Sequence, residues 1–203
     1  MIHPDTELRF INDIIGYGVV AKKLIPKGTI TWVQDELDQV FTPQRAAQVS
    51  PMMQQHLDTY WFTNGAGNKI LCWDNAKFVN HSFNPSCMST AYDFEIAVRD
   101  IQPGEQLTDD YGYLNVEEPF EVVDEGTPRK IVYPDDLLNY HQEWDQLIRE
   151  RLDDITSVDQ PLKKYIPQET WDEFSRVIAG TRPLKSLLTC YHDHAKPAMD
   201  KSA

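Results

Sequence analysis

The sequence has 203 residues, of which 41% are hydrophobic, 11% aromatic and 25% charged. These values are typical of a folded globular chain, and so many aromatic residues exclude intrinsic disorder. The net charge of −13 argues against direct binding of nucleic acid, which needs clustered cations, and favours a basic protein partner. The length allows one domain with an extension or two small domains.

The cysteines and the N-terminus indicate a reducing compartment. Cys72, Cys87 and Cys190 form no disulfide framework and no paired C-x-x-C zinc pattern. The first residues lack the basic and apolar regions of a signal peptide, and no apolar run approaches the roughly 20 residues that cross a bilayer. We expect a soluble protein that is not secreted by a classical signal, cytoplasmic in a bacterium or cytosolic or nuclear in a eukaryote.

The front of the chain has the pattern of short strands and turns. Residues 7–41 contain β-rich runs separated by turns, and residues 69–73, 87–99 and 106–111 are also predicted strands. Between them, Thr42-Pro43 and Ser50-Pro51 each place a capping residue before a proline, which predicts two short helices over 42–58.

The back of the chain has a helical period. An acidic stretch over 117–127 separates the two parts, and apolar residues then recur at helical spacing over 137–152 and 168–179, with a third helix expected over 184–191. We therefore expect a β-rich domain over 1–115, an acidic connecting segment over 116–133 and a helical region over 134–203.

Three segments carry a resemblance to a known family. They are GYGVVA at 16–21, NHSFNP at 80–85 and GEQLTDDYG at 104–112. Together, in this order, they resemble the signatures of the SET domain of protein-lysine methyltransferases. The resemblance covers about residues 8–115. It implies a mainly β fold with α-helices, a β-clip of several small sheets with a knot-like core, here followed by a helical C-terminal extension.

The resemblance also implies an activity. Proteins of this family transfer a methyl group from S-adenosylmethionine to a lysine side chain that enters through a channel from the opposite face. The basic partner would then be a protein substrate, such as a histone-like or ribosomal protein. The alternative is a catalytically weak or inactive module that binds S-adenosylmethionine or a basic peptide.

Site residues follow from the matching motifs. The resemblance implies that Tyr111 is the catalytic phenol, which orients the amine and the methyl group and contacts the cofactor. The other implied cofactor-binding residues are Gly16, Tyr17, Gly18, Asn80 and His81.

Asp109 departs from the family pattern, because an aromatic residue usually stands two positions before the catalytic tyrosine. Strand period places Asp109 on the face of Tyr111, where its carboxylate would enter the substrate channel and either hold the ammonium or keep the amine charged. A twist or bulge would instead turn it to solvent. Phe83 and Ser86 stand where the family signature has Cys and Asn.

The Cys-rich zinc module that often follows the domain is missing, so no metal is expected. Cys190, His192 and His194 have ligand-like spacing, but no further ligand is evident. We expect the helices after residue 134 to cap the front domain instead, with Tyr140 or Trp144 near the mouth of the substrate channel. Apolar surface left on that cap would be a homodimer face.

Overall fold

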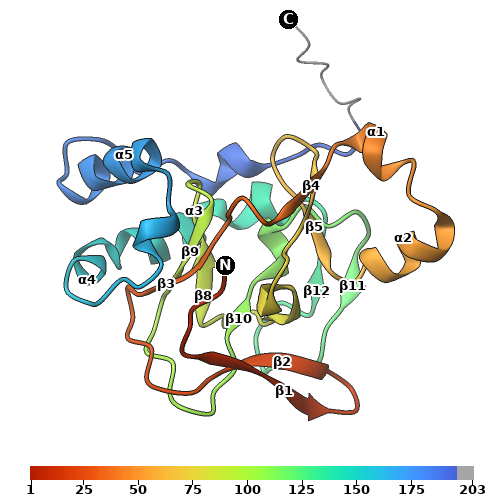
Figure 1. The fold of residues 1–203 in the computed structure, drawn as a ribbon, viewed down its shortest axis with the longest axis horizontal. Helices are drawn as coiled ribbons and strands as arrows, with labels where there is room; N and C mark the ends of the chain where they lie inside the picture. Colours follow the sequence, from red (N-terminus) through yellow and green to blue (C-terminus); the bar gives the residue numbers. More distant parts are fainter. Residues whose placement is uncertain (196–203) are drawn as a thin grey trace, which may run out of the picture.

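In the computed structural model, which describes residues 1–195, the chain forms five small β-sheets and a helical C-terminal region (Figure 1). The strands are β1 (Thr6–Asn12), β2 (Gly16–Ala21), β3 (Ile30–Val33), β4 (Gln39–Phe41), β5 (Trp61–Thr63), β6 (Lys69–Leu71), β7 (Asn80–His81), β8 (Cys87–Ser89), β9 (Phe94–Ala97), β10 (Thr108–Asp109), β11 (Phe120–Glu121) and β12 (Ile131–Val132). The α-helices are α1 (Pro43–Ala46), α2 (Pro51–Leu57), α3 (Asp136–Arg149), α4 (Leu152–Ile155) and α5 (Gln168–Ile178).

The sheets are small, and each joins two or three strands. The β1–β2 hairpin lies along one edge of the molecule (Figure 1). Two three-stranded antiparallel sheets have the orders β3-β9-β8 and β4-β6-β5, and β11 pairs with β12. The remaining pair, β7 with β10, is parallel. These sheets and the helical extension confirm the expected mixed fold, built of several small sheets.

Two predicted strands are shorter in the structure than in the sequence pattern. The run expected over 87–99 is divided into β8 and β9, because the chain reverses between them at Asp93, whose φ is +59°. The run expected over 106–111 is a strand only at Thr108–Asp109. It then turns into a 3-10 helix, η2 (Tyr111–Tyr113), which the Asp110 carboxylate caps by accepting from Gly112 N–H.

The two helices expected over 42–58 are confirmed as α1 and α2. The hydroxyls of Thr42 and Ser50 accept hydrogen bonds from the third residue of each helix, and a proline follows each cap. Neither helix buries a side chain, and both lie at the end of the molecule opposite α4 and α5 (Figure 1).

The C-terminal helices pack on the β3-β9-β8 sheet through one continuous apolar core. Phe94 of β9 and Phe174 of α5 meet edge to face, with ring centroids 4.9 Å apart, and both are fully buried. This core also contains Ile30, Val33, Met88, Ile96, Leu137, Trp144, Ile148 and Ile155. The helical region is therefore packed against the β-rich part of the chain.

The predicted third helix of the C-terminal region is only a single 3-10 turn, η4 (Leu187–Cys190). Its first N–H donates to Asp145 of α3 at 2.8 Å, and the Ser186 hydroxyl caps the next one, so the segment is held by α3 and by its own cap. Residues 196–203, the end of the expected helical region, lie outside the described residues. Within residues 1–195, no helix is both long enough and apolar enough to cross a bilayer.

Candidate active site

Two segments that are almost thirty residues apart in the sequence meet at the centre of the site. In the parallel pair, Asn80 of β7 lies opposite Thr108 of β10, and His81 lies opposite Asp109. Ser82 N–H continues the ladder by donating to the Asp109 carbonyl oxygen at 2.8 Å. The NHS and DDY motifs are thereby held side by side, as the resemblance implied.

Tyr111 is fixed at both of its polar groups. Its hydroxyl donates to the Val79 carbonyl oxygen at 2.6 Å, and its backbone N–H donates to Nδ1 of His81 at 3.0 Å. Burial, together with the nearby carboxyl groups of Asp109 and Glu95, raises the pKa of the phenol above its ordinary value. The ring is therefore a protonated, oriented hydrogen-bond donor at neutral pH.

His81 is neutral and keeps one polar atom unused. Burial, and then the charge of Arg129, lower the pKa of the imidazole to about 4. Because Nδ1 accepts from Tyr111, the ring proton is on Nε2, and Nε2 is buried without a hydrogen-bond partner among the described residues. A buried donor without a partner is costly to the free protein, so it suits an acceptor on a bound molecule.

Asn80 ties this motif to the glycine turn between β1 and β2. Its Nδ2 donates to the Tyr17 carbonyl oxygen at 3.1 Å and to Oε1 of Gln106 at 3.0 Å. A Cβ on Gly18 would lie 2.5 Å from that Gln106 oxygen and 2.7 Å from the Asn80 nitrogen, so only glycine fits there. Gly16 has a φ of +78° and nothing within 4 Å of an added Cβ, so open space adjoins this turn.

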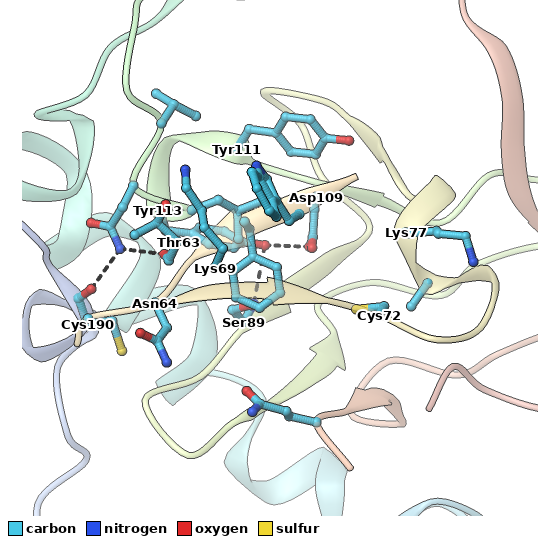
Figure 2. A pocket seen from close by; sticks show the side chains of 18 of the residues that line it. Thr63, Asn64, Lys69, Cys72, Lys77, Ser89, Asp109, Tyr111, Tyr113 and Cys190 are labelled. Atoms are coloured by element: carbon cyan, nitrogen blue, oxygen red, sulfur yellow. Dashed lines mark hydrogen bonds between the residues drawn. The ribbon is translucent and has the colours of Figure 1, made fainter. Parts of the chain in front are cut away.

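A large cavity lies on the other side of Tyr111. Its volume is about 1280 Å³, and its lining includes Val79, Asp109, Tyr111 and Tyr113 but none of the glycine-turn, Asn80 or His81 positions (Figure 2). Residues from η4, β5 and the segment 114–120 complete the walls. Tyr111 thus stands between the polar residues of the NHS motif and an open cavity.

Two carboxyl groups meet in the wall of this cavity. Asp109 Oδ1 accepts from the Tyr113 hydroxyl (Figure 2), and Glu95 Oε1 accepts from the Ser89 hydroxyl at 3.2 Å. The two carboxyl groups lie near enough for each to affect the ionisation of the other. Asp109 is 4% and Glu95 8% exposed. Burial raises both pKa values, that of Asp109 to about 6 and that of Glu95 well above its ordinary range. Because like charges repel, one of two neighbouring buried carboxyl groups holds its proton more strongly, so the pair favours a single negative charge over two.

This geometry decides between the two expectations for Asp109. The side chain faces the cavity that Tyr111 also lines, and it is not turned to solvent. The aromatic residue that the family usually has at this position is replaced here by part of a buried acid pair.

Tyr140 and Trp144, expected near the channel mouth, are not among the residues that line the cavity. Trp144 is 4% exposed and packs edge-on against Tyr113, with ring centroids 5.5 Å apart. Tyr140 lies beside it, under the guanidinium of Arg129 at 4.3 Å. These α3 aromatics support the site from behind and leave its mouth to other residues.

Arg129 explains that placement. Its guanidinium bonds to the carboxylates of Asp110 beside Tyr111 and Asp136 at the start of α3. It also stacks on Phe83 at 4.4 Å. This one side chain joins the connecting segment, the DDY motif and α3, and so draws the aromatic face of α3 behind η2.

The connecting segment also lies against the motifs. Glu125 Oε2 accepts from the Ser82 hydroxyl at 3.0 Å and from Phe83 N–H at 2.8 Å. Phe120 contacts the rings of His81 and Tyr111 edge to face, at 6.2 and 6.3 Å between centroids, and lines the cavity. Within the part of the helical region that the structure describes, up to residue 195, the cavity walls take residues from 185–190 only.

Sequence reasoning did not identify Arg129, Glu95 or Phe120 as part of the site. The sequence signals that could have identified them differ in strength. Arg129 is the first basic residue after the acidic stretch, which is a visible signal for an ion pair. Glu95 occupies a polar position in an alternating strand, which normally indicates an exposed side chain. Phe120 is the one aromatic residue in the acidic stretch over 117–127. Of the candidate metal ligands, His194 Nε2 bonds to the Asn115 carbonyl at 2.8 Å, and residues 1–195 contain no cluster suited to a metal ion.

Comparison with known protein families identifies this region. Residues 16–112 match the model of the SET domain family. None of the curated proteins matches the chain at a significant level. In all, 191 chains of solved structures match. One is a Plasmodium falciparum "putative histone methyltransferase", at 17% identity over 54% of this chain and 95% of that chain, with a TM-score of 0.39. At that score the likeness supports no assignment of individual residues.

Proposed function

Since residues 16–112 of this chain are a SET domain, we propose that the protein transfers a methyl group from S-adenosylmethionine to a lysine side chain of a basic protein. Membership of the family supports methyltransferase chemistry in general, and the donor and the lysine are the finer part of the proposal. The observation that carries it is the position of Tyr111, between Asn80 and His81 on one side and the large cavity on the other.

The residues on the first side fit the methyl donor. The unpartnered Nε2–H of His81 is a donor for an acceptor atom, and the glycine turn at Gly16 adjoins open space. We therefore assign Gly16, Tyr17, Gly18, Asn80 and His81 to hold its amino-acid and adenine portions. When bound, S-adenosylmethionine supplies an electrophilic methyl group on a sulfonium ion.

Tyr111 is proposed to orient the reacting groups from its protonated state. Its hydroxyl hydrogen is committed to the Val79 carbonyl, which leaves the phenol oxygen lone pairs to accept from the incoming amine. Rigid support of the ring matters because in-line transfer needs the nitrogen and the methyl carbon about 3–3.5 Å apart.

The cavity is proposed to take the lysine side chain. A lysine ammonium has a pKa near 10.4 in water and must lose a proton before it can attack. Aromatic residues form part of the lining, and a side chain held among them would lose water, which favours the neutral amine. The net charge of −13 favours a substrate that is basic as a whole, such as a histone-like or ribosomal protein.

A second candidate function is a binding module without turnover. Asp109 favours it, because a carboxylate beside the reacting nitrogen stabilises the ammonium that cannot attack. The module would still bind S-adenosylmethionine or a basic peptide.

The test has two arms. Calorimetry with S-adenosylmethionine and with its demethylated product should show one site, and binding should raise the melting temperature by mass action. Incubation with labelled S-adenosylmethionine and a panel of basic proteins, read by mass spectrometry, should locate the methyl group on lysine. Binding without transfer to any panel member would favour the module, and the absence of binding at millimolar ligand would contradict both.

A further inference from the structure

The acid pair in the cavity wall has no cation to balance its charge. Asp109 and Glu95 are buried, and neither forms an ion pair with any group of residues 1–195. Burying a charge without a partner is strongly unfavourable, so a pair of this kind is kept where something else supplies the opposite charge. The pair lines a cavity, which is where a ligand could supply it.

We propose that Asp109, paired with Glu95, binds the ammonium group of the substrate side chain and supplies its counter-charge. This role rests on the proposed function, in which the ammonium is selected on entry and must still lose its proton to water before transfer. It names the residues that would select a cationic side chain at that site.

The groups that face the acid pair do not neutralise its negative charge. Tyr113 and Ser89 donate hydrogen bonds to it, and the hydroxyl of Tyr111 and the thiol of Cys87 lie near it in neutral form. The other charged groups nearby have partners of their own. Of the lysines that line the cavity, Lys69 pairs with Glu117, Lys185 pairs with Glu173, and Lys77 donates to the backbone carbonyls of Trp73 and Asp74. The Asp110 carboxylate is bound by Arg129, and the N-terminal amine of Met1 is bound by Asp35 and the Val33 carbonyl.

Trp32 gives a second, independent indication of a ligand. It is directly opposite Glu95 in the antiparallel pair of β3 and β9, lines the same cavity and is 5% exposed. Its indole N–H has no hydrogen-bond partner among the described residues. The indole N–H is a donor and cannot bind an ammonium, so what Trp32 offers a cation is its aromatic ring, at the position opposite Glu95.

The rings around the pair suit an alkylammonium group. Trp32 packs edge to face with Phe62 at 6.1 Å, and Tyr111 lines the cavity from the side of the NHS motif. Aromatic rings attract cations through their faces, and tryptophan does so most strongly. The wall thus combines apolar rings for a methylene chain with one carboxylate for its charged end.

The test uses butylammonium chloride as the probe, the full-length protein, and the indole N–H signals of its five tryptophans in NMR spectra. Trp32→Phe assigns the Trp32 signal. We expect butylammonium at pH 7.5 to shift this signal in a saturable way, and butanol, which has the same chain without the charge, to leave it unchanged. Binding should be lost as the pH falls through about 6, where Asp109 takes up a proton.

Three variants locate the charge. Asp109→Asn should weaken butylammonium binding at least tenfold, whereas Glu95→Gln should change it less than twofold, because Gln resembles the protonated Glu. Glu118→Gln is the matched control. Glu118 is an exposed carboxylate that lines the same cavity outside the pair, and its loss removes the same charge from the protein.

Equal weakening in Asp109→Asn and Glu118→Gln would overturn the proposal in favour of general electrostatic attraction. Retained binding in Asp109→Asn, or loss in Glu95→Gln alone, would overturn it as well. If Asp109→Asn fails to fold, binding by the unaltered protein that stays constant from pH 7.5 to pH 5 has the same meaning. Calorimetry with S-adenosylmethionine tests the proposed function in a separate experiment. Either result, binding of S-adenosylmethionine or binding of butylammonium, can therefore fail without the other.

Discussion

At the scale of single residues, Tyr111 connects the two sides of the proposed site. Its hydroxyl and its backbone N–H are both used to fix the ring, by Val79 and by His81. The NHS motif therefore has two roles, because the same imidazole that leaves Nε2 open for a ligand also positions the tyrosine. This coupling predicts that changes to the hydroxyl and to the imidazole have different effects.

Tyr111→Phe removes only the hydroxyl. We expect methyl transfer to fall on the order of 100-fold, because the amine loses its orientation, while affinity for S-adenosylmethionine stays nearly unchanged. Single-turnover rates and calorimetry on the same preparation measure the two quantities. His81→Ala is the comparison, and it should reduce both. Parallel loss of rate and affinity in Tyr111→Phe would instead assign the hydroxyl a structural role.

We expect the ionised Asp109 carboxylate to lower the free energy of unfolding at neutral and basic pH. Folding raises its pKa from 3.8 to about 6, so the folded state binds the proton more tightly, and the free energy of unfolding falls as the pH rises between these values. Asp109→Asn keeps an acceptor for Tyr113 and removes the titration. The variant should be more stable than the unaltered protein at pH 8, on the order of 2 kcal/mol, and no more stable near pH 4.

Thermal unfolding at the two pH values measures this difference. Glu118→Gln, which changes an exposed carboxylate on the same cavity, should leave the melting temperature unchanged at both. An Asp109→Asn variant that is destabilised equally at pH 8 and pH 4 would contradict this prediction. It would show that the carboxylate is needed for packing and that its ionisation does not destabilise the folded protein.

At the scale of elements, short sequence patterns predicted the features that depend on neighbouring residues alone, such as the ends of helices. Thr42 and Ser50 cap their helices, and Gly180 ends α5 with a φ of +68°. The motifs also predicted that Asn80 and Tyr111 would be brought together. Contacts across the chain could not be predicted in this way, because no local pattern states which element a side chain will meet.

Tyr140 and Trp144 illustrate this limit. Their helical period predicted an inward face correctly, but not that Arg129 would hold that face behind Tyr113 and away from the cavity mouth. Glu95 illustrates it again. An alternating strand normally turns its charged residues to solvent, and here β9 is covered on both faces, so its four residues are all buried.

Arg129 is predicted to be the main link between the connecting segment and α3. Arg129→Lys keeps the charge but loses the planar fork that bonds Asp110 and Asp136 together, and it loses the stacking on Phe83. Because two buried carboxylates are left poorly paired, the free energy of unfolding should fall by about 3 kcal/mol. Denaturant unfolding measures it.

Lys130→Met is the control for that prediction. Lys130 pairs with Asp124 at the surface, where both side chains are largely exposed, so its loss should change stability little. If Arg129→Lys proves as mild as this control, the three elements must be held together by apolar contacts alone.

At the scale of the whole molecule, the β-rich part that carries the motifs and the helical region share one core. Ile30, Val33 and Phe94 come from the β-rich part, and Ile148, Ile155 and Phe174 come from the helices, all nearly free of solvent exposure. The wall of aromatic residues behind Tyr113 belongs to α3. The site therefore depends on packing between segments more than a hundred residues apart.

This shared core predicts that the β-rich part cannot stand alone. A protein that ends at Asn115 would expose the apolar face of the β3-β9-β8 sheet and lose the support behind Tyr113, so we expect it to aggregate or to unfold without cooperativity. Phe174→Ala in the full chain is a milder form of the same test. Removing this fully buried ring should cost about 3–5 kcal/mol, whereas Leu138→Ala, at an exposed position of α3, should cost far less. A soluble, cooperatively melting 1–115 fragment with full methyl transfer would show that the helices are an independent module. The sheet face that they cover would then have to be stable in water.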